Sequence, residues 1–236
     1  MTAETAGGAA ALQRSVGISP VPGALPLQLG QADLQLLPER GVWWSQQSVL
    51  FIADTHFGKE ATFRSRSIPI PDQTADDLAR LSVVLQQTAA RRLVILGDLI
   101  HSRSGRSSHV FAQVADWRAQ HAALEITLVR GNHDQSAGDP PADWRIDCVD
   151  DPTDEQGLLL RHVPMADQTP ALAGHLHPVI VLTGPARDSL RLKCFLQQQQ
   201  TLVLPAFSSF VDGRKLRTTA ADRIFAIAEG EVFEVS

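Results

Sequence analysis

Carboxylate, amide and imidazole side chains gather at five places in this sequence, and each group follows a short apolar stretch. The groups read Asp-x-His, Gly-Asp, Gly-Asn-His-Asp, a single His, and Gly-His-x-His. Their members are Asp54, His56, Asp98, Asn132, His133, Asp134, His162, His175 and His177. Such side chains bind divalent metal ions, and the lack of thiolates among them disfavours a structural zinc. Chance explains any one group but explains five in succession poorly, so the sequence predicts a metal centre.

The apolar stretches before the first three groups are expected to be buried strands. They are Leu50–Ala53, Leu93–Leu96 and Ile126–Val129. Helical periodicity between them predicts helices from Thr74 to about Ala90, begun by a capping box at Thr74, and over Ser108–Gln120. A helix between two strands allows them to lie parallel. The polar groups would then meet at the carboxyl edge of a βαβαβ sheet, where α/β proteins place their ligand sites.

The rest of the chain is predicted to be mainly β structure. A hairpin is expected over Pro26–Leu37 with its turn at Gly30-Gln31, followed by a short strand over Gly41–Trp44. The prolines between Lys59 and Asp72 predict a loop without a helix. Strands after Trp144 are expected at Leu158–Leu160, Val179–Leu182, Leu190–Leu196, Leu202–Leu204, Ile224–Ala228 and Val232–Val235. This order predicts an α/β fold with two packed sheets and outer helices.

Length and composition predict one globular domain. The chain has 236 residues, a mass of 25.6 kDa and 44% hydrophobic residues, which suits a single core. Residues 1–22 are rich in Ala and Gly and are expected to lack fixed structure, so the domain is placed at residues 23–236. A net charge of -5 argues mildly against a nucleic-acid partner. A bound metal ion would nevertheless add strong local positive charge at the predicted metal centre.

The cysteines and the N-terminus predict a cytoplasmic protein. Cys148 and Cys194 have no metal-type spacing and are expected to be free thiols in a reducing compartment. The N-terminus lacks the basic and apolar regions of a secretory signal. No apolar stretch approaches the ~18 residues of a membrane span, so no membrane partner is expected.

In their order, the five polar groups resemble the signature of the calcineurin-like metallophosphoesterases. Closer features resemble the bacterial PdeM family of ligase-associated DNA damage response endonucleases, and they are the segments His56–Lys59, Phe63-Arg64, Gly97–His101 and Leu202–Phe207. The resemblance implies a four-layer α/β/β/α sandwich of two mixed sheets flanked by helices. It also implies a nuclease that hydrolyses phosphodiester bonds of DNA in repair, with a DNA ligase or helicase as a functional partner. Ser208–Gly213 contains less glycine than the PdeM pattern, which bears on the rim of the cleft and on substrate choice.

The family pattern also assigns a role to each polar residue. One metal would bind Asp54, His56 and His177, the second would bind Asn132, His162 and His175, and Asp98 would bridge the two. The pattern implies two divalent ions, with Mn²⁺ expected and Fe or Zn²⁺ as alternatives. A hydroxide bridging the ions would attack phosphorus. His133 would assist the leaving group, with Asp134 orienting its ring.

Three more residues are candidates for contacts with the substrate. Lys59 and Arg64 follow the first metal motif and are expected to bind phosphate, Arg as a two-pronged donor and Lys as a point charge. His101 lies three residues beyond Asp98 and is a candidate to approach the substrate.

Two other functions remain open at the level of sequence. One is a phosphatase or phosphodiesterase that acts on a small nucleotide, which a narrow pocket and a weak dependence of affinity on salt would favour. The other is a protein-binding scaffold with the same fold and no catalysis. A scaffold predicts a degraded site, whereas this sequence keeps every expected ligand together with His133.

Overall fold

The computed structural model describes residues 20–64, 70–165, 168–184 and 188–235. Most of the segment predicted to lack fixed structure, residues 1–19, lies outside these ranges. No helix within them is long and apolar enough to span a membrane. Cys148 and Cys194 are free thiols, as predicted.

The first sheet contains the three strands that were predicted to deliver metal ligands. Within the described residues it has seven strands in sequence order. Their bounds are β1 Leu25–Leu29, β2 Ala32–Leu36, β3 Val42–Trp44, β4 Val49–Ile52, β5 Arg92–Leu96, β6 Glu125–Val129 and β7 Ile146–Val149. The strands β1 to β4 pair antiparallel, and β4 to β7 pair parallel. The predicted hairpin and the predicted βαβαβ unit are therefore confirmed.

The second sheet is built from the later part of the chain. It runs in the order β14-β11-β12-β13-β10-β9-β8, and β15 and β16 extend it from β12. The bounds are β8 Thr153–Glu155, β9 Leu158–Leu160, β10 Ala171–Ala173, β11 Pro178–Thr183, β12 Ser189–Gln198, β13 Thr201–Val203, β14 Arg214–Lys215, β15 Arg223–Ala228 and β16 Glu231–Val235. The pairs β9–β10 and β10–β13 are parallel. This mixed sheet places the ends of β9 and β10 near those of the first sheet.

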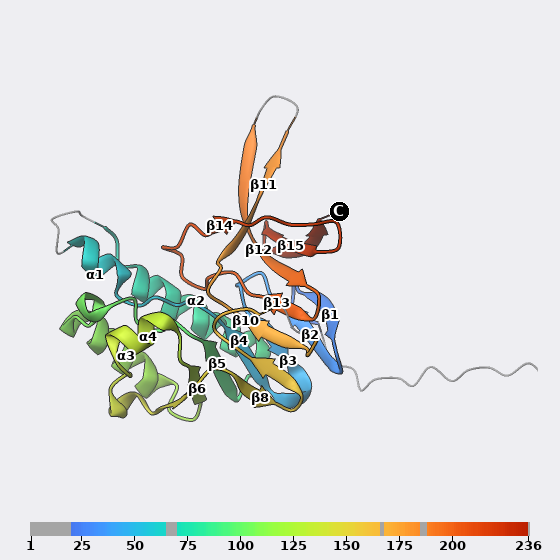
Figure 1. Cartoon of the computed structure of the whole chain (residues 1–236). Helices are drawn as coiled ribbons and strands as arrows, with labels where there is room; N and C mark the ends of the chain where they lie inside the picture. The colour runs from blue at the N-terminus through green and yellow to red at the C-terminus, as the bar shows by residue number, and fades with distance from the viewer. Residues whose placement is uncertain (1–19, 65–69, 166–167, 185–187, 236) are drawn as a thin grey trace, which may run out of the picture.

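The helices lie together on one side of the first sheet (Figure 1). Their bounds are α1 Lys59–Arg64, α2 Gln73–Thr88, α3 Ser108–Gln120 and α4 Asn132–Ala137, with 3-10 turns at Ser45–Gln47, Arg103–Gly105 and Ala142–Trp144. Leu81 of α2 and Val114 of α3 pack on Leu50 and Leu93 in one apolar core. Phe51, Phe195 and Phe225 share a second core, which lies between the two sheets. The two-sheet α/β sandwich is thus confirmed.

Within the described ranges every α-helix precedes Gly138, so the helices come from the first part of the chain. Leu216 and Thr218, after β14, line a pocket together with Cys194 and Leu196 of the second sheet. In Figure 1 the β11–β12 ribbon projects from this side of the molecule.

The prediction that residues between Lys59 and Asp72 form only a loop is wrong in its first part, because α1 begins at Lys59. The described proline, Pro71, comes after this helix and does not interrupt it. Glu60 of α1 is buried, and its carboxylate accepts a 2.6 Å hydrogen bond from the Thr74 hydroxyl. A tertiary contact therefore stabilises a helix too short to be stable alone.

The cap of α2 also differs from the prediction. Thr74 was predicted to begin a capping box, but the N-cap is Asp72, whose carboxylate accepts from the Ala75 amide at 3.3 Å. The Thr74 hydroxyl is engaged by Glu60 instead. Its oxygen also accepts from the Gly58 amide at 3.2 Å. Because α2 begins at Gln73, Thr74 lies inside the helix, and Asp72 is the residue in the N-cap position.

Replacing Phe195 by Ala is expected to destabilise the fold strongly. Its ring is fully buried between the sheets, and a cavity of that size costs about 3–5 kcal/mol. Urea unfolding of the variant measures this free energy. Phe233→Ala is the matched control, because Phe233 is 38% exposed and its loss should cost less than about 1 kcal/mol. Equal losses in the two variants would contradict the position of the core.

Candidate metal centre

The predicted ligands lie where the ends of five strands meet. Asp54 and His56 follow β4, Asp98 follows β5, and Asn132 follows β6 at the start of α4. The second sheet supplies His162 after β9, together with His175 and His177 between β10 and β11. Parallel strands within each sheet, and the packing of one sheet on the other, bring these loops to one place.

Backbone strain is concentrated at these ligands. Five of them are non-glycine residues with positive φ, namely Asp54 (56°), His56 (46°), Asp98 (55°), His175 (69°) and His177 (48°). This left-handed conformation is unfavourable for residues with a Cβ atom, and such strain persists where surrounding contacts enforce it. The Asp98 amide donates to Asp134, and the His175 amide donates to Asp54. Hydrogen bonds of this kind hold the strained turns.

One group of side chains contains Asp54, His56 and His177, whose candidate ligand atoms all lie within 4.8 Å of one another. The Nε2 atoms of His56 and His177 are 3.4 Å apart, and His177 Nε2 is 3.3 Å from Asp54 Oδ1. Burial, and then the neighbouring histidines, lower the pKa of His56 well below its usual range. His56 is therefore neutral at pH 7, as a metal ligand must be.

A second group contains Asp98, His162 and His175. His162 Nδ1 lies 3.0 Å from the Leu96 carbonyl oxygen, which can only accept, so Nδ1 carries the proton and Nε2 keeps its lone pair. That Nε2 atom lies 3.0 Å from Asn132 Oδ1 and 3.1 Å from His175 Nδ1. The backbone carbonyl thus sets the tautomer that a metal requires.

Asp98 lies between the two groups. Its Oδ2 is 3.8 Å from His56 Nε2, and its Oδ1 is 3.4 Å from His162 Nε2. Burial raises the pKa of Asp98, which means that the bare carboxylate is unfavourable there. Asp98 therefore directs one carboxylate oxygen toward each group of ligands, as a residue that bridges two metals must.

The donor set fits divalent cations. Asp54 Oδ1 is buried and has no hydrogen-bond partner within the described residues, and a buried unpaired charge is costly. The lone pairs of His162 Nε2 and Asn132 Oδ1 face each other across 3.0 Å, and His175 Nδ1 lies 3.1 Å from His162 Nε2. A cation on each side of Asp98 would satisfy the orphaned oxygen and these lone pairs together. The structure therefore brings all seven predicted ligands into one arrangement that can hold two metals.

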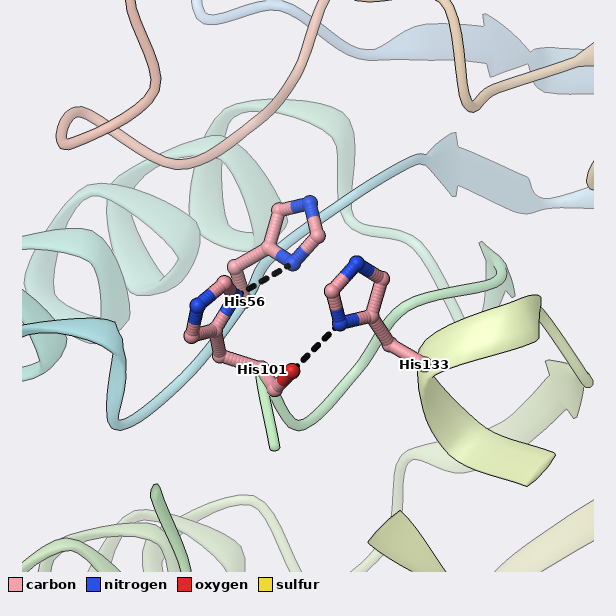
Figure 2. A group of neighbouring side chains, drawn as sticks. All are labelled: His56, His101 and His133. Carbon is pink, nitrogen blue, oxygen red and sulfur yellow. Dashed lines mark hydrogen bonds between the residues drawn. The ribbon is translucent and has the colours of Figure 1, made fainter. Parts of the chain in front are cut away.

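His133 and His101 lie beside this centre and form a third group with His56 (Figure 2). The rings of His101 and His133 stack with 5.1 Å between their centroids. His133 Nδ1 faces the backbone carbonyl of His101, and its Nε2 lies 3.9 Å from Asp98 Oδ2. Burial lowers the pKa of His101 to about 4, so this ring is neutral. The carbonyl engages His133 Nδ1, so Nε2 is the ring nitrogen on the side of Asp98.

The prediction that Asp134 orients the His133 ring is wrong. The buried Asp134 carboxylate accepts from three backbone amides, those of Asp98 (2.7 Å), Leu99 (3.0 Å) and Gly131 (2.9 Å). The His133 ring is oriented by the His101 carbonyl instead. Asp134 therefore positions the metal ligands by fixing the β5 and β6 loops against each other. The position of Asp134 next to His133 in the sequence does not reveal that its carboxylate binds backbone amides.

A cleft of about 570 Å³ opens beside the metal ligands, and its lining includes His175, His177 and Lys59. Lys59, the first residue of α1, is thus placed as predicted for a contact with the substrate. Arg64 is not: its Nε donates to the Ile70 carbonyl at 2.9 Å, and it does not line this cleft. Arg64 lies at the end of α1 and binds the chain that follows this helix, and the predicted loop contained no helix.

Sequence reasoning missed several residues of the site. Arg214 of β14 lines the cleft, although its position in the sequence suggests only a solvated basic cluster. Asp151 accepts a hydrogen bond from the His162 amide at 3.1 Å. Only the pairing of elements far apart in the chain reveals these two contributions. Phe210 also lines the cleft, and it belongs to Ser208–Gly213, the segment that the sequence analysis connected with the rim.

The fold and the site define a metal-dependent phosphoesterase. The family model of the calcineurin-like phosphoesterases matches residues 48–194, which is more than half of the chain. The protein belongs to this family. The match covers all seven candidate ligands, from Asp54 to His177.

Solved structures extend the comparison. The crystal structure of the nuclease MPE from Pseudomonas putida is 37% identical, with a TM-score of 0.78, and the match covers 90% of this chain and all (100%) of that one. The phosphoesterase Yfce from E. coli is 18% identical over 79% of this chain and 97% of its own, with a TM-score of 0.38. The Aquifex aeolicus protein AQ665 is 22% identical over 55% and 77%, with a TM-score of 0.36. The last two scores are too low to support an argument. The comparison with curated proteins gave no match.

Gly97→Ala is expected to displace His162 and to lower the metal content. Gly97 has φ +81°, and an added Cβ would lie 2.1 Å from His162 Nδ1. Gly157→Ala is the matched control, since Gly157 has φ +86° with nothing within 4 Å of an added Cβ. Both variants carry backbone strain of about 1–2 kcal/mol, but only Gly97→Ala should bind fewer than two metals per chain by elemental analysis. Equal metal contents would contradict the collision.

Asp98→Asn is expected to abolish the stabilisation of the protein by metal. Mn²⁺ at 100 times its Kd should stabilise the chelator-treated native protein by about 2.7 kcal/mol, and the variant should gain far less. The raised pKa of Asp98 means that its charge destabilises the metal-free fold at pH 7. The metal-free variant should therefore unfold at the same temperature as the metal-free native protein or at a higher one. Calorimetry measures both effects, and full stabilisation by Mn²⁺ would exclude a bridging role.

Proposed function

We propose that the protein is a phosphodiesterase that hydrolyses DNA. The observation that carries this proposal is the convergence of six candidate ligands around a seventh, Asp98, with the cleft beside His175 and His177. A metal-dependent phosphoesterase that is 37% identical to a nuclease across the whole of that nuclease is a strong candidate for the same type of substrate. The PdeM-like segments support endonuclease action in DNA repair, beside a ligase or helicase.

The metals would be held by Asp54, His56, Asp98 and His177 on one side, and by Asp98, Asn132, His162 and His175 on the other. Ions bound there would polarise the phosphoryl oxygens and activate water. We further propose Mn²⁺ as the native ion, because nitrogen and oxygen donors without a thiolate suit it. Fe and Zn²⁺ are the alternatives that metal analysis would distinguish.

The surrounding side chains complete the chemistry. Lys59 and Arg214 line the cleft and provide positive charge for phosphate groups outside the metal sites. Desolvation lowers the pKa of Lys59, although a nearby carboxylate, Asp212, opposes this shift. His133, held through Nδ1 by the His101 carbonyl, can give a proton from Nε2 to the leaving alkoxide.

The function is tested with metal-stripped protein to which Mn²⁺ is added back. Substrates are bis-p-nitrophenyl phosphate and labelled single-stranded, duplex and circular DNA. We expect Mn²⁺-dependent cleavage of DNA, and cleavage of the circle if the enzyme is an endonuclease. Cleavage of the small diester alone would move the proposal to small nucleotides. A metal-loaded protein inactive on every substrate would favour a scaffold.

His133→Ala is expected to keep two metals per chain and to lower kcat about 10²- to 10⁴-fold. His109→Ala is the control, because His109 is 59% exposed and bonds Asp72 on the protein surface. Kinetics and elemental analysis on the same samples separate loss of rate from loss of metal. A His133 variant that loses its metals, or one that retains full activity, would contradict the assigned role.

A further inference from the structure

One wall of the catalytic cleft is formed by residues 206–213, here called the rim segment. Ser209, Phe210, Val211, Asp212 and Gly213 of this segment line the cleft together with the ligands His175 and His177. The segment follows β13 and has almost no regular structure of its own. Its conformation must therefore be imposed by the rest of the protein.

Buried and half-buried charged side chains impose that conformation. The Lys193 ammonium group donates to the carbonyls of Ala206, Ser208 and Val211, at 3.2, 2.8 and 2.8 Å. Burial lowers the pKa of Lys193 to about 7, which reflects the cost of an ammonium group in this position. Three acceptors on one segment offset that cost while they fix the path of the backbone.

Two arginines and an aspartate hold the same segment from other elements. Arg40 and Arg80 both donate to the Phe207 carbonyl. Asp77 of α2 accepts from the Ser209 amide at 3.1 Å and from its hydroxyl at 2.8 Å, and it pairs with Arg80. Charges from three separate parts of the chain thus converge on a few residues beside the cleft.

The rim segment is also connected directly to the metal centre. The Phe207 amide donates to the Ala53 carbonyl at 2.8 Å, and the Ser208 amide lies 3.3 Å from the Asp54 carbonyl. The residue after Ser209, Phe210, is therefore held at a fixed position relative to the metal ligand Asp54.

Phe210 belongs to a small aromatic group at the mouth of the cleft. Its ring meets that of Phe63 edge to face, with 5.3 Å between the centroids and 89° between the planes. The Lys59 ammonium nitrogen lies 5.6 Å from the Phe210 ring centre. Phe63 and Lys59 belong to α1, and all three residues line the cleft and are half-buried. The two rings therefore present apolar surface within reach of a molecule whose phosphate is at the metals.

An aromatic surface next to a cation matches the two chemical parts of a nucleotide. Nucleobases stack on aromatic side chains, and phosphates are attracted to ammonium groups and metals. A small phosphate ester without a base would leave the two rings exposed to water, so they would contribute nothing to its binding. We propose that Phe210, supported by Phe63, stacks on a nucleobase of the substrate beside the phosphate that is cleaved. This inference rests on the proposed action on DNA and names a residue that recognises it.

The test compares DNA cleavage at one bond with and without its neighbouring base. A labelled single-stranded oligonucleotide carries one abasic tetrahydrofuran residue, and the same sequence with all its bases is the reference. For the native enzyme, kcat/KM at the bonds flanking the abasic residue should fall roughly 5- to 100-fold, as expected for the loss of one stacking contact. Phe210→Ala should cleave both oligonucleotides at the lower rate.

Two variants separate stacking from packing. Phe210→Trp keeps a stacking surface and should retain the preference for the base, whereas Phe210→Leu keeps apolar bulk and should lose it. Phe233→Ala, at an exposed position on β16, should behave as the native enzyme. Binding of the same oligonucleotides to metal-free protein, followed by fluorescence anisotropy, should show the same pattern in Kd.

The outcomes distinguish the proposed action on DNA from the proposed stacking role of Phe210. If the native enzyme cleaves DNA but Phe210→Ala or Phe210→Leu keeps the base preference, the stacking role of Phe210 is overturned and the nuclease function stands. If the native enzyme cleaves bis-p-nitrophenyl phosphate and no DNA, the proposed function is overturned and the stacking role with it. A preference present in the native enzyme and the Trp variant, and absent in the Ala and Leu variants, supports both.

Discussion

The buried carboxylates of Asp54 and Asp98 are the constraint on which the rest of the site depends. Both side chains are almost completely removed from water, and one oxygen of Asp54 has no hydrogen-bond donor among the described residues. Burial of such charge is unfavourable unless positive charge compensates it. The histidines beside them are poor sources of that charge, because burial lowers the pKa values of His56 and His175. Divalent cations would provide this compensation, and the carboxylate, amide and imidazole groups that converge here are suited to bind them.

In such a site the loops that carry the ligands must keep their positions even when no cation balances the charge of the carboxylates. The strained left-handed turns at Asp54, His56 and Asp98 are held by backbone hydrogen bonds between neighbouring loops. Asp134 contributes most visibly, since its carboxylate joins the β5 loop to the start of α4 through three amides. The role of Asp134 is therefore structural, because its hydrogen bonds keep Asp98 between the two groups of ligands. This preorganisation is what allows a metal centre to act without first rearranging the protein.

Local sequence was sufficient to predict most of this arrangement, and the reasons for its failures are physical. The strands before Asp54, Asp98 and Asn132 are mostly apolar, and α2 has clear helical periodicity, so their existence could be predicted. The short helix α1 could not, because Glu60 and Thr74 stabilise it from outside. The same holds for Asp134 and Arg64, whose partners are backbone groups of residues that the pattern does not specify. Contacts between side chains and distant backbone leave no periodic signal in a sequence.

The rim segment shows why this distinction matters for function. The metal ligands follow directly from strand ends, so their chemistry is encoded in short motifs that a single sequence reveals. The wall of the cleft depends on Arg40, Asp77, Arg80 and Lys193, which come from three parts of the chain and meet only in the folded protein. The metal ligands and the wall of the cleft are therefore specified by different kinds of structure. On the proposed role of Phe210, substitutions of this residue and its neighbours would change substrate choice while the metal centre stays the same.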